Sequence, residues 1–337
     1  MNARISHDRH PDVPEEFPEI QRALLDWYRA NARDLPWRHT RDPYRILVSE
    51  VMLQQTQVDR VIPRYHSFLE RFPTAEALAA APTADVIREW AGLGYNRRAV
   101  NLQRAAKAVV DEYGGEFPSD VATLKSLPGI GPYTAGAIAC FALEQDVGFL
   151  DTNIRRVLHR LFVGPEVPEQ SRNQRQMESL ATSVVPAGNG WEWGQTLIEF
   201  GALQCTARNP ACLTCPVQDR CRSFPQIQTV LAELGRNGFR RKQEAPFEGS
   251  NRFYRGRVLR ALQESPHDTD GLNLDLLGSR VRDDYTRSHE PWLRDVIDGL
   301  ARDGLVEIAE ERDPYDSGPS NRVRLPGTVS HHRPESD

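Results

Sequence analysis

Apolar residues recur at three- and four-residue spacing over most of the chain, which is the period of amphipathic helices. The longest such stretches are residues 18–32 and 43–72, and Pro63 is expected to divide the second into two helices. Shorter helical stretches follow as far as residue 185, separated by turns that contain Gly and Pro. No alternating strand pattern precedes residue 300, so the first two thirds of the chain are predicted to be α-helical.

The pattern changes after Cys221. Residues 226–250 read as a linker with a short basic run, which suits either a solvated segment or a contact to phosphate. Three helical stretches and then two short strands follow, at residues 253–263, 273–285, 291–304, 305–309 and 321–325. This order predicts a winged-helix-like domain over residues 251–326, an architecture that contacts DNA in some proteins and protein partners in others.

The length and the net charge of the chain exclude few functions. A chain of 337 residues suggests two or three domains. The net charge of −5 does not exclude nucleic-acid binding, because one local basic face is enough to hold phosphates. The sequence has no apolar run long enough for a membrane span and no apolar N-terminal secretory segment. We therefore expect a cytoplasmic protein that does not engage a membrane.

Four of the five cysteines lie close together, with the spacing C-x6-C-x2-C-x5-C: Cys205, Cys212, Cys215 and Cys221. In a cytoplasmic protein such a group indicates a metal site instead of disulfides. Four thiolates bind either a zinc ion or a four-iron cluster. One short and two longer spacings favour the iron–sulfur cluster, and zinc remains the alternative. Cys140 lies inside an apolar helical stretch and is expected to be a core residue.

A second motif lies at residues 127–143, where a Pro-Gly-Ile-Gly-Pro turn joins two helical stretches. Gly129 and Gly131 permit a tight turn and a close approach to a partner. The following helix N-terminus offers free N–H groups and the positive end of a dipole, which suits a phosphate. The segment resembles the helix-hairpin-helix motif, a sequence-independent binder of the DNA backbone, and an ordinary αα turn is the alternative.

Five blocks, in this order and spacing, resemble the MutY family of adenine DNA glycosylases: residues 43–65, 92–102, 127–138, 150–162 and 201–221. That family belongs to the helix-hairpin-helix superfamily, which also contains endonuclease III. The resemblance covers about residues 20–225, and the block SEVMLQQTQ points to MutY more than to its relatives.

The resemblance implies a mainly α, two-domain fold with a 4Fe–4S cluster held by the four cysteines. A six-helix domain containing the hairpin would span residues 35–144. The cluster domain would combine residues 17–34 with 145–225. The linker over residues 226–250 and the winged-helix-like domain over 251–326 would follow.

Excision of adenine needs an acid that protonates the leaving base and a carboxylate that stabilises positive charge on the sugar. Glu50 lies in an apolar helical stretch, and an apolar pocket would raise its pKa and keep it protonated. Asp151 precedes a helix, where it also suits an N-cap. By resemblance, Glu50 matches the family's general acid and Asp151 its catalytic aspartate.

Tyr133 occupies the hairpin position where bifunctional members of the superfamily carry a lysine nucleophile. A tyrosine forms no imine with the sugar, so the resemblance implies a monofunctional enzyme in which Tyr133 lies near the aspartate. The related thymine-mismatch glycosylases also fit a tyrosine here, so this residue does not by itself select adenine.

Base extrusion leaves a gap in the DNA stack that inserted side chains fill. Gln55 and Tyr95 match the positions that wedge into DNA in the MutY family. The residues that match the lining of the adenine pocket are Leu35, Trp37, Arg38 and Gln195. The chain departs from the family at Asn96, where many members carry a second tyrosine. The C-terminal region also lacks the pattern of the β-rich domain that helps longer members recognise 8-oxoguanine.

The sequence thus predicts a monomeric, monofunctional glycosylase of base excision repair that acts in the cytoplasm on nucleoid DNA. Its substrate would be duplex DNA with adenine opposite 8-oxoguanine or guanine. One alternative is a thymine or uracil glycosylase at G mismatches on the same fold. Another is a non-catalytic iron–sulfur protein that binds DNA, which the winged-helix-like tail suggests.

Overall fold

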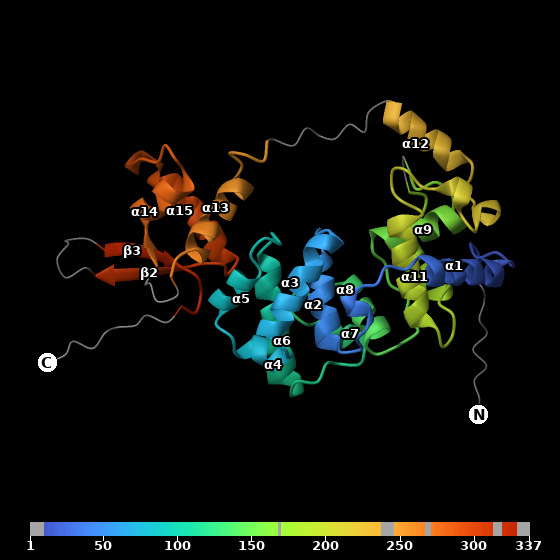
Figure 1. Cartoon of the computed structure of the whole chain (residues 1–337), viewed down its shortest axis with the longest axis horizontal. Helices are drawn as coiled ribbons and strands as arrows, with labels where there is room; N and C mark the ends of the chain where they lie inside the picture. Colours follow the sequence, from blue (N-terminus) through green and yellow to red (C-terminus); the bar gives the residue numbers. More distant parts are fainter. Residues whose placement is uncertain (1–9, 168–169, 237–245, 267–270, 313–318, 329–337) are drawn as a thin grey trace. The chain divides into compact units, whose positions relative to one another are not determined.

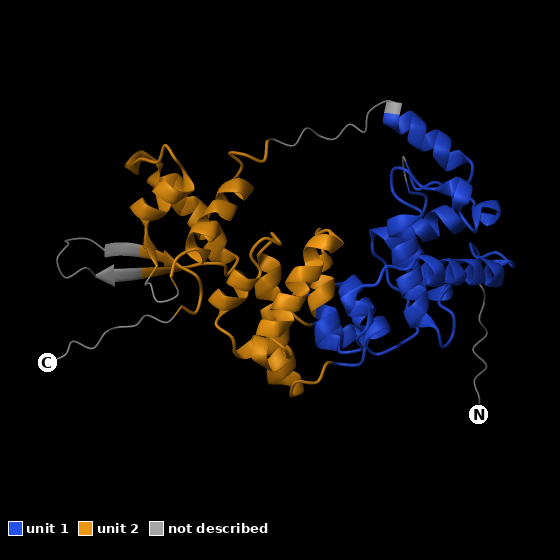
Figure 2. Cartoon of the chain, in the orientation of Figure 1, with its two compact units in different colours: residues 1–47, 118–126, 130–242 blue, residues 48–117, 127–129, 243–337 orange. Residues whose placement is uncertain are grey.

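The computed structural model of the chain describes residues 10–167, 170–236, 246–266, 271–312 and 319–328. The chain divides into two compact units, which Figure 2 colours separately. Unit 1 consists of residues 1–47, 118–126 and 130–242, and unit 2 of residues 48–117, 127–129 and 243–337. These limits differ from the predicted domain limits, which stay a prediction. Among the described helices, none has the length and apolar character needed to cross a bilayer.

The described elements are mainly helices, as the periodicity predicts (Figure 1). Unit 1 contains α1 (Phe17–Asn31), η1 (Pro36–Arg38), the start of α2 (Pro43–Leu53), α7 (Val121–Leu124), α8 (Pro132–Phe141), α9 (Thr152–Phe162), α10 (Gln174–Ser183), α11 (Gly190–Leu203), η2 (Cys212–Thr214), η3 (Gln218–Arg220) and α12 (Gln226–Arg236). Unit 2 contains the rest of α2, α3 (Val58–Arg71), α4 (Ala75–Ala80), α5 (Thr83–Glu89), α6 (Arg97–Tyr113), α13 (Asn251–Gln263), β1 (Leu272–Asn273), α14 (Leu274–Val281), η4 (Arg287–His289), α15 (Glu290–Arg302), β2 (Glu307–Arg312) and β3 (Pro319–Arg324).

The break between α2 and α3 does not lie at Pro63, which is inside α3. It lies at residues 54–57, where Gln55 adopts a φ of 56°. A left-handed residue cannot continue a right-handed helix, so α2 ends before Gln55. The prediction that Pro63 divides the stretch was wrong, because the backbone conformation at Gln55 ends the helix first.

The segment predicted as a linker begins with helix α12. Ile227 and Leu231 lie one helical turn apart and are both buried, so α12 has one apolar face against unit 1. Residues 226–236 of the predicted linker are therefore helical, and the limits of the linker stay a prediction. Three residues of the predicted basic run, Arg240, Arg241 and Lys242, lie outside the described residues.

Helices α9 and α11 form the centre of unit 1. Helix α10 packs on α9, while α1 and α8 pack on α11. Close approach of α9 and α11 depends on Gly201, since a Cβ there would lie 2.8 Å from the Cβ of Asn153. This packing places the start of α9 beside the end of α11, where the cysteine-rich loop begins.

In unit 2, α4 and α5 pack on α6, and the described C-terminal residues add α13, α14, η4, α15 and a small sheet. The sheet is antiparallel with the order β1-β3-β2, and Leu272 pairs with Val323. The sequence pattern missed β1, because two residues are too few to show an alternation. The order of the described helices and strands here is α13, β1, α14, η4, α15, β2 and β3, and the winged-helix-like domain stays a prediction. Its core also includes Ala84, Ile87 and Val100 of α5 and α6.

Two adjacent leucines of α14 test this C-terminal core. Leu277 is fully buried in it, whereas Leu276 is 43% exposed. We expect Leu277→Ala to lower the free energy of unfolding by about 3 kcal/mol, through lost burial and a cavity. We expect Leu276→Ala to lower it by less than about 1 kcal/mol. Urea denaturation followed by tryptophan fluorescence measures both, and equal losses would contradict the packing.

Candidate functional site

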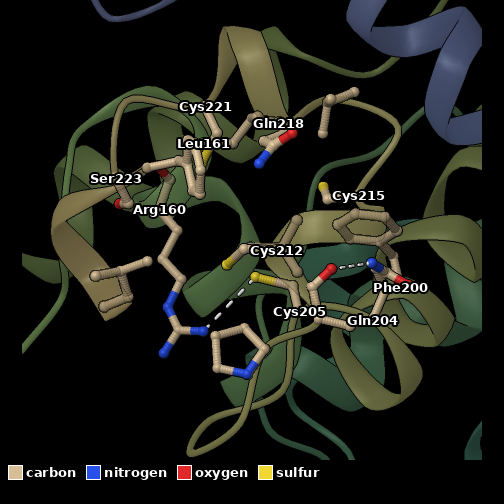
Figure 3. A pocket seen from close by; sticks show the side chains of 16 residues that line it. Arg160, Leu161, Phe200, Gln204, Cys205, Cys212, Cys215, Gln218, Cys221 and Ser223 are labelled. Carbon is tan, nitrogen blue, oxygen red and sulfur yellow. Dashed lines mark hydrogen bonds between the residues drawn. The ribbon is translucent and has the colours of Figure 1, made fainter. Parts of the chain in front are cut away.

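The four clustered cysteines line one cavity in unit 1 (Figure 3). All four are free thiols, and apolar residues such as Phe200, Val217 and Ile227 complete the wall. Among the described residues, no three His, Cys, Asp or Glu side chains converge closely enough to bind one metal ion. Four thiols around one cavity are a donor set that suits a zinc ion or an iron–sulfur cluster.

The environment of these thiols suits metal ligands. Burial raises the pKa of all four, that of Cys215 to about 12. They would therefore be neutral at pH 7 unless a bound metal stabilised the thiolates. Arg160 supplies positive charge at this cavity, because its Nη1 lies 3.7 Å from the Sγ of Cys205. The same nitrogen donates to the carbonyl of Thr206 at 2.7 Å, and Glu166 pairs with the other side of the guanidinium.

A chain of hydrogen bonds connects Asp151 to the cysteine-rich loop. The Nδ2 of Asn153 donates to Oδ2 of Asp151 at 3.0 Å. The Nη2 of Arg156 donates to Oδ1 of Asn153 at 2.8 Å, and its Nε donates to the carbonyl of Cys205 at 2.8 Å. The same Nη2 also reaches the carbonyl of Gly201 at 2.6 Å. Helix α9 therefore holds the predicted catalytic carboxylate and the backbone of the first cysteine in one network.

Asp151 is also the N-cap of α9, as its position predicts, and accepts the N–H of Ile154 at 2.6 Å. Burial raises the pKa of this carboxyl above its ordinary value, whereas the bonds from Ile154 and Asn153 lower it in part. The charge of Arg156 also lowers it. The donors and the charge of Arg156 thus oppose the effect of burial only in part, and the net shift of the Asp151 pKa is upward.

Two of the predicted base-pocket residues are in direct contact in unit 1. The Nε of Arg38 donates to Oε1 of Gln195 at 2.9 Å, and both residues are buried. Leu35 and Trp37, on the same segment as Arg38, are buried as well.

The sequence prediction missed Glu199, which organises this group. Its Oε2 accepts from Nη2 of Arg38 at 2.7 Å, and Arg33 donates to both of its oxygens at 2.8 Å. Burial alone would raise the pKa of Glu199, but the bonds from the two arginines lower it to about 2. A charged residue amid the apolar positions of α11 is the signal that could have drawn attention to it, as the same signal led to the prediction of Glu50.

The other predicted residues occupy defined local positions. Glu50 is 6% exposed on α2, in unit 2, between buried Ser49 and Val51. Tyr133, on α8 in unit 1, packs its ring against Phe149 at a centroid distance of 5.7 Å.

The two hairpin glycines differ from each other. Gly129 needs to be glycine, since its φ is +76° and a Cβ would lie 2.7 Å from that of Asn101. Gly131 has an ordinary φ of −88° and open space around it, so neither conformation nor crowding requires glycine there. It is the N-cap of α8 and, as a glycine, makes no side-chain hydrogen bond to the N–H groups of that helix.

Gln55 and Tyr95, the predicted wedge residues, share an unusual backbone in unit 2. Both are left-handed, with φ of 56° and 47°, and both are exposed, Tyr95 by 56%. Such a conformation costs a non-glycine residue about 1–3 kcal/mol and persists only where the surroundings impose it.

Two family models match the chain. Residues 48–182 match the HhH-GPD superfamily of base excision DNA repair proteins, and residues 205–221 match the iron–sulfur binding domain of endonuclease III. An adenine DNA glycosylase of Mycolicibacterium smegmatis is 39% identical over 289 residues, which are 84% of this chain and 91% of that protein. The chain belongs to the adenine DNA glycosylase family. It is thus a DNA glycosylase of base excision repair, a hydrolase, and its cofactor is a 4Fe–4S cluster.

Solved structures agree with the fold. A thermostable thymine-DNA glycosylase matches with a TM-score of 0.59 and 30% identity, covering 63% of this chain and 98% of that one. An endonuclease III trapped as a covalent intermediate with DNA matches with a TM-score of 0.52 and 25% identity, covering 61% and 95%. The mainly α, helix-hairpin-helix glycosylase fold is confirmed, and so is DNA as the partner of this adenine DNA glycosylase family member.

If the four cysteines bind the cluster, two cysteine variants should differ in their iron content. Cys215→Ser removes a side chain that faces the cavity, and we expect loss of the iron and of the visible absorption of the cluster. Cys140→Ser is the control, because Cys140 is buried in α8 and donates its S–H to the carbonyl of Gly190. A serine can make the same bond, so the iron content should stay at the wild-type level. Iron retained by Cys215→Ser would contradict the site.

The network around Asp151 predicts a pH shift. Its predicted role needs the ionised carboxylate, so activity should fall as the pH falls through its raised pKa. Asn153→Ala removes a donor that lowers that pKa, so the acidic limb of the single-turnover rate should move to higher pH. Exposed Thr152 provides the control, and Thr152→Ala should leave the profile in place. A profile unmoved by Asn153→Ala would show that the bond does not tune Asp151.

Proposed function

We propose that this chain is a monofunctional glycosylase that hydrolyses the N-glycosidic bond of adenine opposite 8-oxoguanine or guanine. It acts as a monomer on duplex DNA in the cytoplasm, at the nucleoid. The observation that carries the proposal is the hydrogen-bonded carboxylate of Asp151, tied through Asn153 and Arg156 to the cluster loop. Membership of the adenine DNA glycosylase family supports adenine as the base.

Two carboxyl groups have different roles in the reaction. Glu50 donates a proton to the adenine ring as the bond from C1′ to the base breaks and its electrons leave with the base. Burial of Glu50 supports this role, because an apolar setting favours the neutral acid. Asp151 stabilises the positive charge that develops on the sugar, and water then adds at C1′.

The remaining residues bind and orient the DNA. Gln55 and Tyr95 enter the gap left by the extruded adenine, and Gly129 and Gly131 bring the hairpin to the phosphate backbone. Leu35, Trp37, Arg38 and Gln195 line the base pocket, with the buried Arg38–Gln195 contact as support. Tyr133 provides no amine, so no imine forms with the sugar and strand cleavage is not part of the reaction.

The four cysteines Cys205, Cys212, Cys215 and Cys221 bind the 4Fe–4S cluster in this proposal. The cluster is not a catalytic metal here, because the carboxyl groups of Glu50 and Asp151 account for the bond cleavage. Its part is to fix the loop after α11, to which Arg156 and Arg160 are bonded.

A panel of duplexes tests the proposal. Single-turnover release of base is measured with A:8-oxoguanine, A:G, T:G and U:G pairs. Adenine should be released, and T:G and U:G should remain intact. The Glu50→Gln and Asp151→Asn variants should each slow adenine release by at least about 100-fold. Exposed residues of α6 provide matched controls, and Glu112→Gln and Asp111→Asn should keep the wild-type rate.

The rival functions give different results in the same panel. Preferential release of thymine from T:G would assign the chain to the repair of thymine mismatches. The panel includes this pair because the chain is similar to a thymine-DNA glycosylase and because Tyr133 also fits that class of enzyme. Binding without release of any base would indicate a non-catalytic protein. Full activity of the Glu50 or Asp151 variant would overturn the residue assignment.

A further inference from the structure

Arg98, near the start of α6, forms hydrogen bonds with the C-terminal end of α2, the helix that carries Glu50. Its Nη1 donates to three carbonyls at the C-terminal end of α2, those of Val51 at 2.7 Å, Met52 at 3.1 Å and Gln54 at 2.5 Å. The last carbonyls of a helix have no partner within it and form the negative end of its dipole. Arg98 therefore caps α2 directly before Gln55.

The other terminal nitrogen of Arg98 holds a second segment. Its Nη2 donates to the carbonyls of Leu93 at 3.2 Å and Gly94 at 3.1 Å, and to the hydroxyl of Thr56 at 3.2 Å. The guanidinium also lies 5.7 Å from the ring centroid of Tyr95 and 5.4 Å from that of Trp90. One side chain thus binds the residues on both sides of Gln55 and the two residues before Tyr95.

This contact is electrostatically unusual. In the part of the chain that the structure describes, every hydrogen-bond acceptor of Arg98 is a carbonyl or hydroxyl oxygen, and none is a carboxylate. Burial lowers its pKa to about 10, which still leaves it charged at neutral pH. Within the described residues, its buried Nε has no acceptor. A half-buried cation without an anion lowers the stability of the fold. The most evident use of Arg98 is therefore to restrain the two loops that contain Gln55 and Tyr95.

The two loops need such a restraint. Gln55 and Tyr95 are both left-handed non-glycine residues, and strained backbone relaxes where nothing imposes it. The planar guanidinium has donors in a fixed fork, and it fixes both loops relative to each other and to α2. A lysine in its place would have one nitrogen with three N–H donors, whereas the six acceptors are shared by four N–H donors on two nitrogens of Arg98.

We propose that Arg98 is a positioning residue for base extrusion, which holds Gln55 and Tyr95 together in the geometry that enters the DNA stack. This inference rests on the proposed glycosylase function and adds the device that orients its two wedge residues. Arg98 touches neither the base nor the sugar in this proposal and acts through the two loops.

The test separates extrusion from chemistry by the choice of substrate. Single-turnover adenine release is measured with adenine opposite 8-oxoguanine, and with adenine opposite an abasic-site analogue, where extrusion is less costly. We expect Arg98→Lys to slow release about 30-fold on the paired duplex, as a wedge misplaced by a fraction of an ångström would. On the unpaired duplex it should slow release less than about three-fold. Arg104→Lys, an exposed arginine of the same helix, is the control and should change neither rate.

A double-mutant cycle gives the second readout. In a chain that already carries Gln55→Ala and Tyr95→Ala, Arg98→Lys should slow release on the paired duplex by less than about two-fold more. Two results would overturn the proposal and leave Arg98 with a role in stability alone. One is an equal slowing on both duplexes, and the other is a full 30-fold slowing by Arg98→Lys in the chain that already lacks the Gln55 and Tyr95 side chains. Wild-type rates for Arg98→Lys would overturn it as well.

Two further controls keep the outcomes distinct. Thermal melting and cluster absorption report whether Arg98→Lys is folded. If it melts below the assay temperature, Thr56→Val replaces it, since this change removes one acceptor and keeps the guanidinium. About a three-fold loss confined to the paired duplex then supports the proposal, and a loss on both overturns it. A wild-type chain that releases no adenine from either duplex would refute the proposed function, not the role of Arg98 in holding the loops.

Discussion

The organisation of unit 1 depends on the hydrogen bonds made along one face of α9. Asp151 caps the helix, Asn153 bonds to it, and Arg156 connects Asn153 to the carbonyl of Cys205. One turn further on, Arg160 reaches the sulfur of the same cysteine. Residues 156 and 160 lie four apart and so project from the same side of the helix. A single rigid element therefore orients the carboxylate at its start and the cluster loop along its length.

Arginine recurs in this chain as a donor to carbonyls at the C-terminal ends of other helices. Arg156 bonds to the carbonyl of Gly201 in the last turn of α11, and Arg98 bonds to those at the end of α2. Each helix end would otherwise leave carbonyls without partners in a half-buried place. A guanidinium satisfies several of them at once with fixed geometry, which an ammonium cannot do. The same property explains the buried pairing of Arg33 and Arg38 with Glu199, whose pKa falls to about 2.

Patterns of neighbouring residues predicted many of the helices and the cysteine cluster. The features that they did not predict depend on contacts between residues far apart in the sequence. The period of apolar residues located α9 and α13, and the spacing of the cysteines indicated the cluster. Glu199 escaped notice because its partner Arg33 is 166 residues away. The role of Arg98 is equally hidden, since its acceptors on α2 lie more than 40 residues earlier. The position of the break after α2 depends on the left-handed Gln55, which no local pattern marks, whereas Pro63 suggested the wrong place.

If α9 connects the cluster loop to the carboxylate, then removal of the cluster must impair catalysis and not DNA binding alone. The direct measurement is single-turnover adenine release from an A:8-oxoguanine duplex at saturating protein, before the cluster is removed, after removal, and after it is rebuilt with iron and sulfide. We expect removal of the cluster to slow adenine release by at least about 100-fold, and rebuilding to restore it, because a displaced carboxylate loses its effect on the developing charge. A cluster-free chain that keeps its helical circular dichroism and releases adenine at the original rate would contradict it.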